Sequence, residues 1–96
     1  MSDGFRASVV EVFPMRLGGE TLVDLTLEVS GDAPFDPPRA DDPVRFGAGG
    51  RLVDLTVWAA PALARPEGSR LVNVQFRRED LEGVELSVGM SVDVQP

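Results

Sequence analysis

Residues 14–29 read P-M-R-L-G-G-E-T-L-V-D-L-T-L-E-V, and residues 43–59 repeat the phrase as P-V-R-F-G-A-G-G-R-L-V-D-L-T-V-W-A. A shorter echo, G-S-R-L-V-N-V-Q-F, covers residues 68–76. Each copy is a glycine turn followed by a run of alternating apolar and polar residues, which is typical of strands that start at a turn. The repeat predicts a chain built from short antiparallel strands.

The alternation also predicts which side chains point inward, because a strand with one buried face places every second residue in the core. The inward positions expected in 21–29, 52–59 and 71–77 are Val23, Leu25, Leu27, Val29, Val53, Leu55, Val57, Ala59, Val72, Val74 and Phe76. From 84 to 94 every even-numbered residue is apolar, which is the alternation typical of strands, and Gly89 marks a tight turn or a bulge within this stretch.

The first strand, 5–13, is apolar on both faces. A regular alternation places Phe5, Val9 and Phe13 on one face and Val10 and Val12 on the other, with Pro14 ending the strand. A further short strand is possible at 44–46, and residues 78–83 can form no more than one helical turn.

Together these elements predict a single all-β domain over residues 1–96, folded as a six- to seven-stranded antiparallel β-barrel or sandwich. One long Pro/Gly-rich loop is expected at 30–50, and loops of that length in compact domains are usually functional or disordered. Phe35 lies between acidic residues in this loop and is expected to tether it to the core.

The segment F-R-R-E-D-L-E-G-V-E-L-S-V-G-M-S-V-D-V, residues 76–94, resembles the last part of the β-barrel domains of translation elongation factors. The opening F-R-A-S-V-V-E-V is similar in kind. The resemblance implies a closed barrel. The long loop and the duplicated strand have no counterpart in that family, and no GTPase motif is present.

The composition limits the partners and the chemistry of the chain. Sixteen carboxylates stand against nine arginines, with no lysine, histidine or cysteine, which gives a net charge of −7. This charge repels nucleic acid, whose binding depends on basic groups, and it either serves solubility or attracts a basic protein partner. Without cysteine no disulfide forms, and no apolar run is long enough to span a membrane, so a cytoplasmic protein is expected.

We expect no enzymatic activity, no cofactor and no metal. Histidine, cysteine, lysine and tyrosine are all absent, so acid–base or nucleophilic catalysis would rest on carboxylates and hydroxyls alone. Asp24 and Asp54 occupy matching places in the repeat and could bind a hard cation together with Asn73. The alternative is that the two aspartates are solvated on strands that are not neighbours.

The residues expected to make contacts with a partner are Trp58, Leu52, Leu22, Leu71 and Phe35. Each of the first four occupies an outward position in its own strand. On a flat sheet they would therefore form an apolar stripe on the polar face, unless a loop covers Trp58. We therefore expect a non-catalytic protein-interaction or assembly module that acts through a sheet edge or the Trp58 face, with a protein partner or a second copy of the chain. The alternative is a small-ligand-binding β-barrel gated by the 30–50 loop. The almost wholly apolar inward positions weigh against it, since ligand pockets need a few polar groups.

Overall fold

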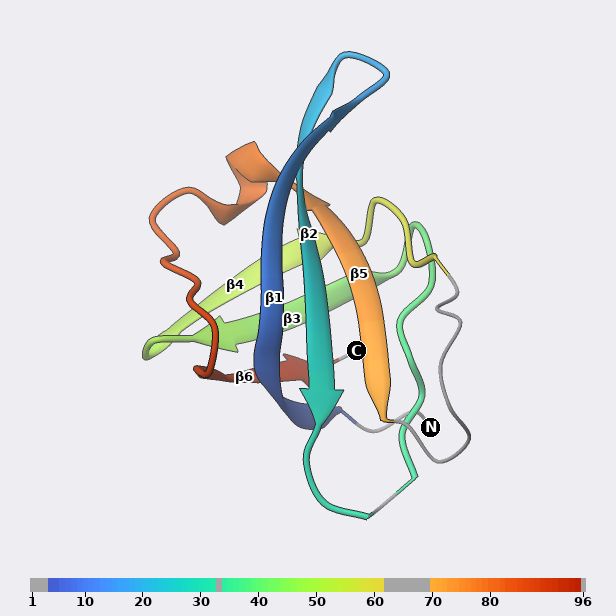
Figure 1. Cartoon of the computed structure of the whole chain (residues 1–96), viewed down its shortest axis with the longest axis vertical. Helices are drawn as coiled ribbons and strands as arrows, with labels where there is room; N and C mark the ends of the chain where they lie inside the picture. The colour runs from blue at the N-terminus through green and yellow to red at the C-terminus, as the bar shows by residue number, and fades with distance from the viewer. Residues whose placement is uncertain (1–3, 33, 62–69, 96) are drawn as a thin grey trace.

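The computed structural model describes residues 4–32, 34–61 and 70–95 (Figure 1). In chain order its elements are β1 (Phe5–Leu17), β2 (Glu20–Val29), β3 (Pro43–Ala48), β4 (Arg51–Thr56), β5 (Leu71–Arg77), the short 3₁₀ helix η1 (Arg78–Leu81) and β6 (Ser91–Gln95). The strands form one sheet in the order β4-β3-β6-β1-β2-β5, and all neighbours are antiparallel. The prediction of an all-β antiparallel fold is confirmed.

Both long copies of the repeated phrase are β-hairpins. Gly18 and Gly19 connect β1 to β2, and Gly49 and Gly50 connect β3 to β4. All four glycines have positive φ, between 58° and 83°, which is the backbone of a two-residue type I′ turn. Only glycine adopts two such conformations in succession at little cost, so the paired glycines set the register of each hairpin. The glycine turn of the third copy falls largely in 62–69, outside the described residues.

The sheet bends around the core but is not closed into a barrel. In Figure 1, β1, β2 and β5 run upright, while β3, β4 and β6 cross them at a steep angle. The outer strands β4 and β5 do not pair with each other as strands. The chain after β4 nevertheless reaches β5 at one place, where Ala59 forms an isolated bridge with Gln75 and the Trp58 N–H donates to the Gln75 carbonyl oxygen at 2.8 Å.

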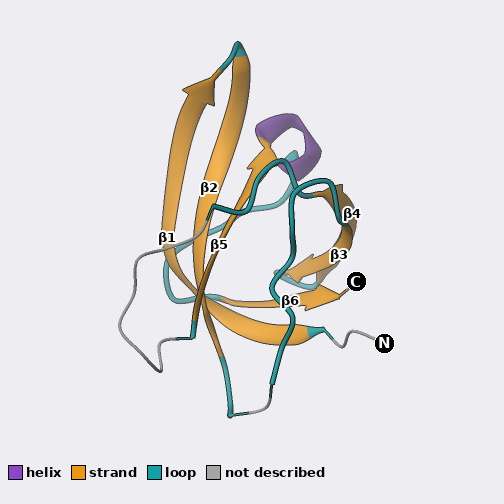
Figure 2. Cartoon of the chain, turned by 90° about the vertical axis from the view of Figure 1, so that its right-hand side faces the viewer, coloured by secondary structure: helices purple, strands orange, loops and turns teal. Residues whose placement is uncertain are grey.

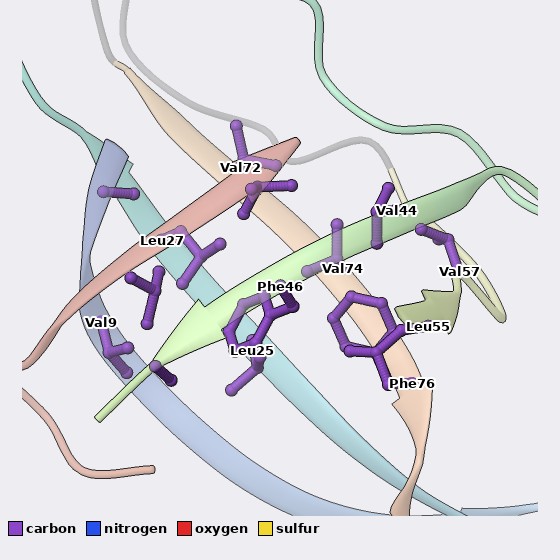
Figure 3. Packing of buried hydrophobic residues seen from close by; sticks show 14 of the residues in the cluster. Val9, Leu25, Leu27, Val44, Phe46, Leu55, Val57, Val72, Val74 and Phe76 are labelled. Atoms are coloured by element: carbon purple, nitrogen blue, oxygen red, sulfur yellow. The ribbon is translucent and has the colours of Figure 1, made fainter. Parts of the chain in front are cut away.

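The core lies between the two halves of the bent sheet (Figures 2 and 3). Phe46 of β3 and Phe76 of β5 meet there with ring centroids 5.9 Å apart. The predicted inward positions Leu25, Leu27, Val29, Leu55, Val57, Val72, Val74 and Phe76 are buried, whereas Val23, Val53 and Ala59 are only partly so. Each fully buried Leu, Val or Phe side chain stabilises the fold by about 1.5–3 kcal/mol before entropy is subtracted.

The prediction for the faces of β1 is wrong because the strand contains a β-bulge. Val9 lies opposite Leu27 and Glu11 lies opposite Thr26, so Val10 has no partner on β2. One extra residue reverses the side-chain alternation beyond it. Val12 therefore packs against the core on the same side as Val9, while Phe13 turns to the outer face, where it is 55% exposed.

Pro14 does not end the strand, as was predicted, because β1 continues to Leu17. It lies opposite Val23 of β2, but β6 pairs with β1 only from Phe5 to Ser8. At Pro14 the strand thus has a neighbour on one side only. A proline is tolerated in a strand when its missing N–H would face an open edge.

Two other predicted boundaries change. β6 comprises only residues 91–95, and 84–90 has no strand pairing although its apolar residues alternate. Gly89, with φ 93°, marks the place where the pairing stops. The possible strand at 44–46 is present and is longer, as β3, so the connection after β2 covers 30–42 and not 30–50. Within the described residues, no helix is long and apolar enough to cross a membrane.

Candidate functional site

The tip of the β1–β2 hairpin extends beyond the other strands in Figure 1. After Ser8, the side of β1 that faces β6 makes only two described backbone hydrogen bonds. The Val9 N–H donates to the Met90 carbonyl oxygen at 2.9 Å, and the Gly89 N–H donates to the Val9 carbonyl oxygen at 2.8 Å. No described strand pairs with this side from Val10 to Leu17, and we call this stretch the open edge.

The register shows which backbone groups the open edge offers. In a two-residue hairpin the pair beside the turn, here Leu17 and Glu20, is hydrogen-bonded, and hydrogen-bonded and non-hydrogen-bonded pairs then alternate. Counting back from the turn, Arg16, Pro14 and Val12 belong to non-hydrogen-bonded pairs and turn their backbone groups away from β2. The open edge therefore offers two N–H groups, from Val12 and Arg16, and three carbonyl oxygens.

The outer face of the hairpin is apolar beside this edge. Phe13 and Leu17 are 55% and 49% exposed, and Val10 at the bulge is 43% exposed. Met15 lies between Phe13 and Leu17 on the same face and is half-buried. Exposed apolar side chains grouped in this way, next to unpaired backbone groups, are features of contact surfaces.

A polar cluster supports the base of the hairpin on this outer face. The Asn73 side-chain amide donates to both carboxylate oxygens of Asp24 at 3.1 Å and to the Leu25 carbonyl oxygen at 3.0 Å. The Gln75 amide donates to Asp24 at 3.0 Å. Asn73 and Gln75 are buried, although the alternation of β5 predicts an outward position for both. Their hydrogen bonds therefore fix β2 against β5 at a place that is shielded from water.

A hollow of about 750 Å³ lies beneath the hairpin, on its concave face. Val12 and Val23 line it from the hairpin, and Leu81, Val84 and Leu86 line it from the opposite side. Its polar rim contains Glu20, Glu79, Glu82 and Arg78. Three carboxylates against one guanidinium make this rim acidic.

The predicted contact residues do not form one stripe. Leu52 on β4 is 67% exposed, but Leu22 on β2 is completely buried, which removes it from any exposed face. Leu71 is half-buried at the far end of β5, where it pairs with Glu28, and Leu22 pairs with Arg77 at the other end.

The remaining two predicted residues lie elsewhere. Trp58 is half-buried just after β4, next to Gln75. Phe35 contacts Phe5, with ring centroids 5.4 Å apart, and lies under the Arg70 guanidinium at 5.0 Å. It packs against the core, as expected of a residue that tethers the loop. Sequence reasoning missed Phe13 because the bulge could not be located from the alternation, and it missed Leu17 because the strand was expected to end at Pro14.

The two aspartates of the repeat do not share a site. Asp24 binds the Asn73 and Gln75 amides, whereas Asp54 pairs with Arg45 at 3.1 Å on the exposed surface of β3 and β4. β2 and β4 are not neighbours in the sheet. In the part of the chain that the structure describes, no three acidic side chains come together in a way that could bind a metal ion.

A second hollow, of about 280 Å³, lies where the 30–42 connection passes the chain ends. Pro37, Pro38 and Asp42 line it from the connection, with Phe5 and Val94 opposite. Its volume is just below the range of about 300–1,000 Å³ that is usual for small-molecule sites.

No protein-family model matches the sequence, and neither a curated protein nor a solved structure is significantly similar to the chain. The candidate function is therefore argued from the geometry alone.

Proposed function

We propose that this chain is a non-catalytic protein-interaction module that binds an extended segment of a partner protein along the open edge of β1. The observation that supports this most strongly is the eight-residue stretch Val10–Leu17, which has β2 on one side and no described strand on the other. Addition of a strand to such an edge provides backbone hydrogen bonds for affinity and side-chain contacts for specificity.

Other edges of the sheet fit this role less well. β4 is only six residues long, and its exposed positions include Arg51 and Asp54, charges of the kind that protect an edge against pairing. The outer edge of β5 is already in contact with the 58–59 segment at Gln75. The open edge of β1 combines greater length with exposed apolar side chains.

A second copy of the chain is a poor occupant. Pro14 lies at the middle of the open edge and has no N–H to donate. If two copies paired symmetrically about this residue, the two prolines would face each other and both hydrogen bonds of that pair would be lost. A net charge of −7 on each copy adds repulsion. A basic segment of another protein avoids the repulsion and loses only one of the two hydrogen bonds, since it can still donate an N–H to the Pro14 carbonyl oxygen.

The test uses a photo-crosslinking amino acid at Phe13, with the same residue at Leu52 as the exposed control on β4. We expect one partner to crosslink at Phe13 and not at Leu52. That partner, once identified by mass spectrometry and purified, should bind the wild-type chain and the Arg16→Ala variant equally. It should bind Arg16→Pro at least about tenfold more weakly, because proline removes an N–H from the open edge and no hydrogen bond to β2.

Two results would contradict the proposal. A partner that binds Arg16→Pro as tightly as Arg16→Ala does not pair with the edge. A partner that crosslinks only at Leu52 uses another surface.

Small-ligand binding beneath the 30–42 connection is the second candidate function, favoured by the 280 Å³ hollow between Pro37, Pro38 and Phe5. A fragment screen by NMR tests it. Binding would shift the amide signals of Phe5 and Val94, and an absence of shifts at both would exclude a ligand there.

A further inference from the structure

We infer that the 750 Å³ hollow beside the open edge is the specificity pocket for the bound segment, and that this segment has an apolar residue opposite Val12 and basic residues two positions away from it. The inference rests on the proposed function, since it assigns side chains to the strand that pairs with β1. It concerns the concave face of the hairpin and not the outer face described above.

The geometry of pairing connects the edge to the hollow. Residues directly opposite each other in a β-ladder project their side chains to the same face of the sheet. Val12 lines the hollow and also turns its backbone groups to the open edge. A residue of the bound segment that pairs with Val12 therefore directs its side chain into the hollow.

The lining of the hollow indicates an apolar side chain at that position. Val23, Leu81, Val84 and Leu86 all line it, together with Val12. Leu81 is buried, and the other four pack partly buried against the core. Filling the space with an aliphatic group would remove more of this apolar surface from water, at about 25 cal/mol per Å².

The rim of the hollow indicates basic residues two positions before and after the apolar one, because every second side chain of a strand points to the same face. Glu79 and Glu82 lie on η1 and just after it, and Glu20 lies at the turn of the hairpin. Glu20 is 3.7 Å from Arg77, but Glu79 and Glu82 have no salt bridge among the described residues. Lysine or arginine in the bound segment would compensate this charge, and the overall charge of −7 favours the approach of such a segment.

The segment 84–88 gives the pocket a wall that is not part of the sheet. Its apolar residues alternate, yet it forms no strand. Its two described backbone hydrogen bonds lie near its ends, from the Val84 N–H to the Leu81 carbonyl oxygen and from the Met90 N–H to the Ser87 carbonyl oxygen. Val88 is 68% exposed. A wall held mainly at its two ends can adjust to the side chain that enters.

The probe is a short synthetic peptide with valine at its centre, lysine two positions before and after it, and threonine at the positions between, titrated into the ¹⁵N-labelled full chain. We expect shifts at the Val12 and Arg16 amides and NOEs between peptide valine methyl groups and those of Val12 and Leu86. Leu86→Lys should weaken binding at least about tenfold, because it places a positive charge in the pocket. The matched variant Val88→Lys adds the same charge outside the lining and should bind normally. A peptide with glutamate in place of both lysines should bind more weakly than the lysine peptide.

The outcomes separate the two proposals. If Arg16→Pro abolishes binding while the NOEs to Leu86 are absent and Leu86→Lys binds normally, the pocket is not used and the edge proposal stands. If the peptide binds but neither variant weakens it, both proposals are wrong. If the lysine peptide does not bind, or if peptide addition only changes a dimer of the chain, the inference of a basic segment is overturned and the crosslinking result alone decides the edge proposal.

Discussion

Asn73 and Gln75 show how single residues determine the arrangement of β2 and β5. The alternation of β5 predicts a solvent-facing position for both side chains, yet both are buried and donate hydrogen bonds from their amides to Asp24. Among the described residues, no buried side-chain nitrogen or oxygen atom lacks a hydrogen-bond partner. Because an unsatisfied buried polar group costs about 1–3 kcal/mol, the complete pairing of this cluster stabilises the base of the hairpin.

Replacement of Asn73 by leucine tests this cluster. Asn73→Leu removes three hydrogen-bond contacts and leaves the Asp24 carboxylate with the Gln75 amide as its only described partner. We expect a loss of about 1–3 kcal/mol in the free energy of unfolding, measured by urea denaturation. Arg45→Leu, which breaks an exposed ion pair to Asp54, is the control and should cost less than about 1 kcal/mol. An equal effect of the two substitutions would mean that the cluster is not stabilising.

At the same scale, Leu22 shows what the sequence could not predict. Alternation placed Leu22 correctly on the face opposite Val23 and Leu25, but it could not show that this face is covered at Leu22. Parity gives the direction of a side chain. Burial on an outer face depends on neighbouring segments that only the folded chain brings together.

At the scale of elements, β1 determines the candidate site through its bulge. The extra residue Val10 turns Val12 toward the hollow and Phe13 toward solvent. The sequence predicted a strand that is apolar on both faces, but it did not reveal which valine is unpaired. In a run such as S-V-V-E-V several positions can carry a bulge at similar cost, so only pairing with β2 and β6 selects one.

Deletion of Val10 tests the role of the bulge. Without this residue Val9 and Glu11 follow each other opposite Leu27 and Thr26, so the strand alternates regularly and Val12 stays on the core face. We expect the deletion to change the free energy of unfolding by less than about 1 kcal/mol in urea denaturation, since Val10 is exposed and no buried side chain changes its position. Deletion of Val12 is the control, because it brings the Glu11 carboxylate opposite Leu25 on the core face, and it should cost at least about 2 kcal/mol. If the two deletions were equally harmful, the extra residue would not be a bulge that the pairing with β2 merely accommodates.

The segment 84–90 illustrates the opposite error, because its alternation predicted a strand that does not form. Every even residue there is apolar, but Val84 and Leu86 line a hollow and Val88 is exposed, so the pattern is satisfied without pairing. Local alternation cannot distinguish a paired strand from an extended segment that lines a pocket, because the two differ only in whether a neighbouring strand forms hydrogen bonds with the segment.

At the scale of the whole molecule, the fold class was predictable and the closure of the sheet was not. Repeated glycine turns and alternating runs were sufficient for an antiparallel all-β chain. The barrel or sandwich prediction depended on contacts between distant segments, such as the single bridge from Ala59 to Gln75, which have no local signature. The predicted stripe of Trp58, Leu52, Leu22 and Leu71 is dispersed for the same reason, because Leu22 is buried and Leu71 lies at the other end of β5.

The charge and the open edge together predict the oligomeric state. We expect a monomer by light scattering coupled to size exclusion at all concentrations, because Pro14 impairs pairing between copies and each copy has a charge of −7. Raised salt should not produce a dimer, since screening removes the repulsion but does not restore the missing N–H. A discrete dimer with protected Val12 and Arg16 amides would show that a second copy occupies the edge.

Amide hydrogen exchange of the free chain tests the central claim most directly, since it asks whether the edge of β1 is open. The account predicts that the Val12 and Arg16 amides exchange rapidly, while the Phe13 and Met15 amides, which face β2, are protected. The same alternation should disappear when the lysine–valine peptide is bound. Equal and strong protection of all four amides in the free monomer would mean that the chain itself covers this edge, and would contradict the proposed function.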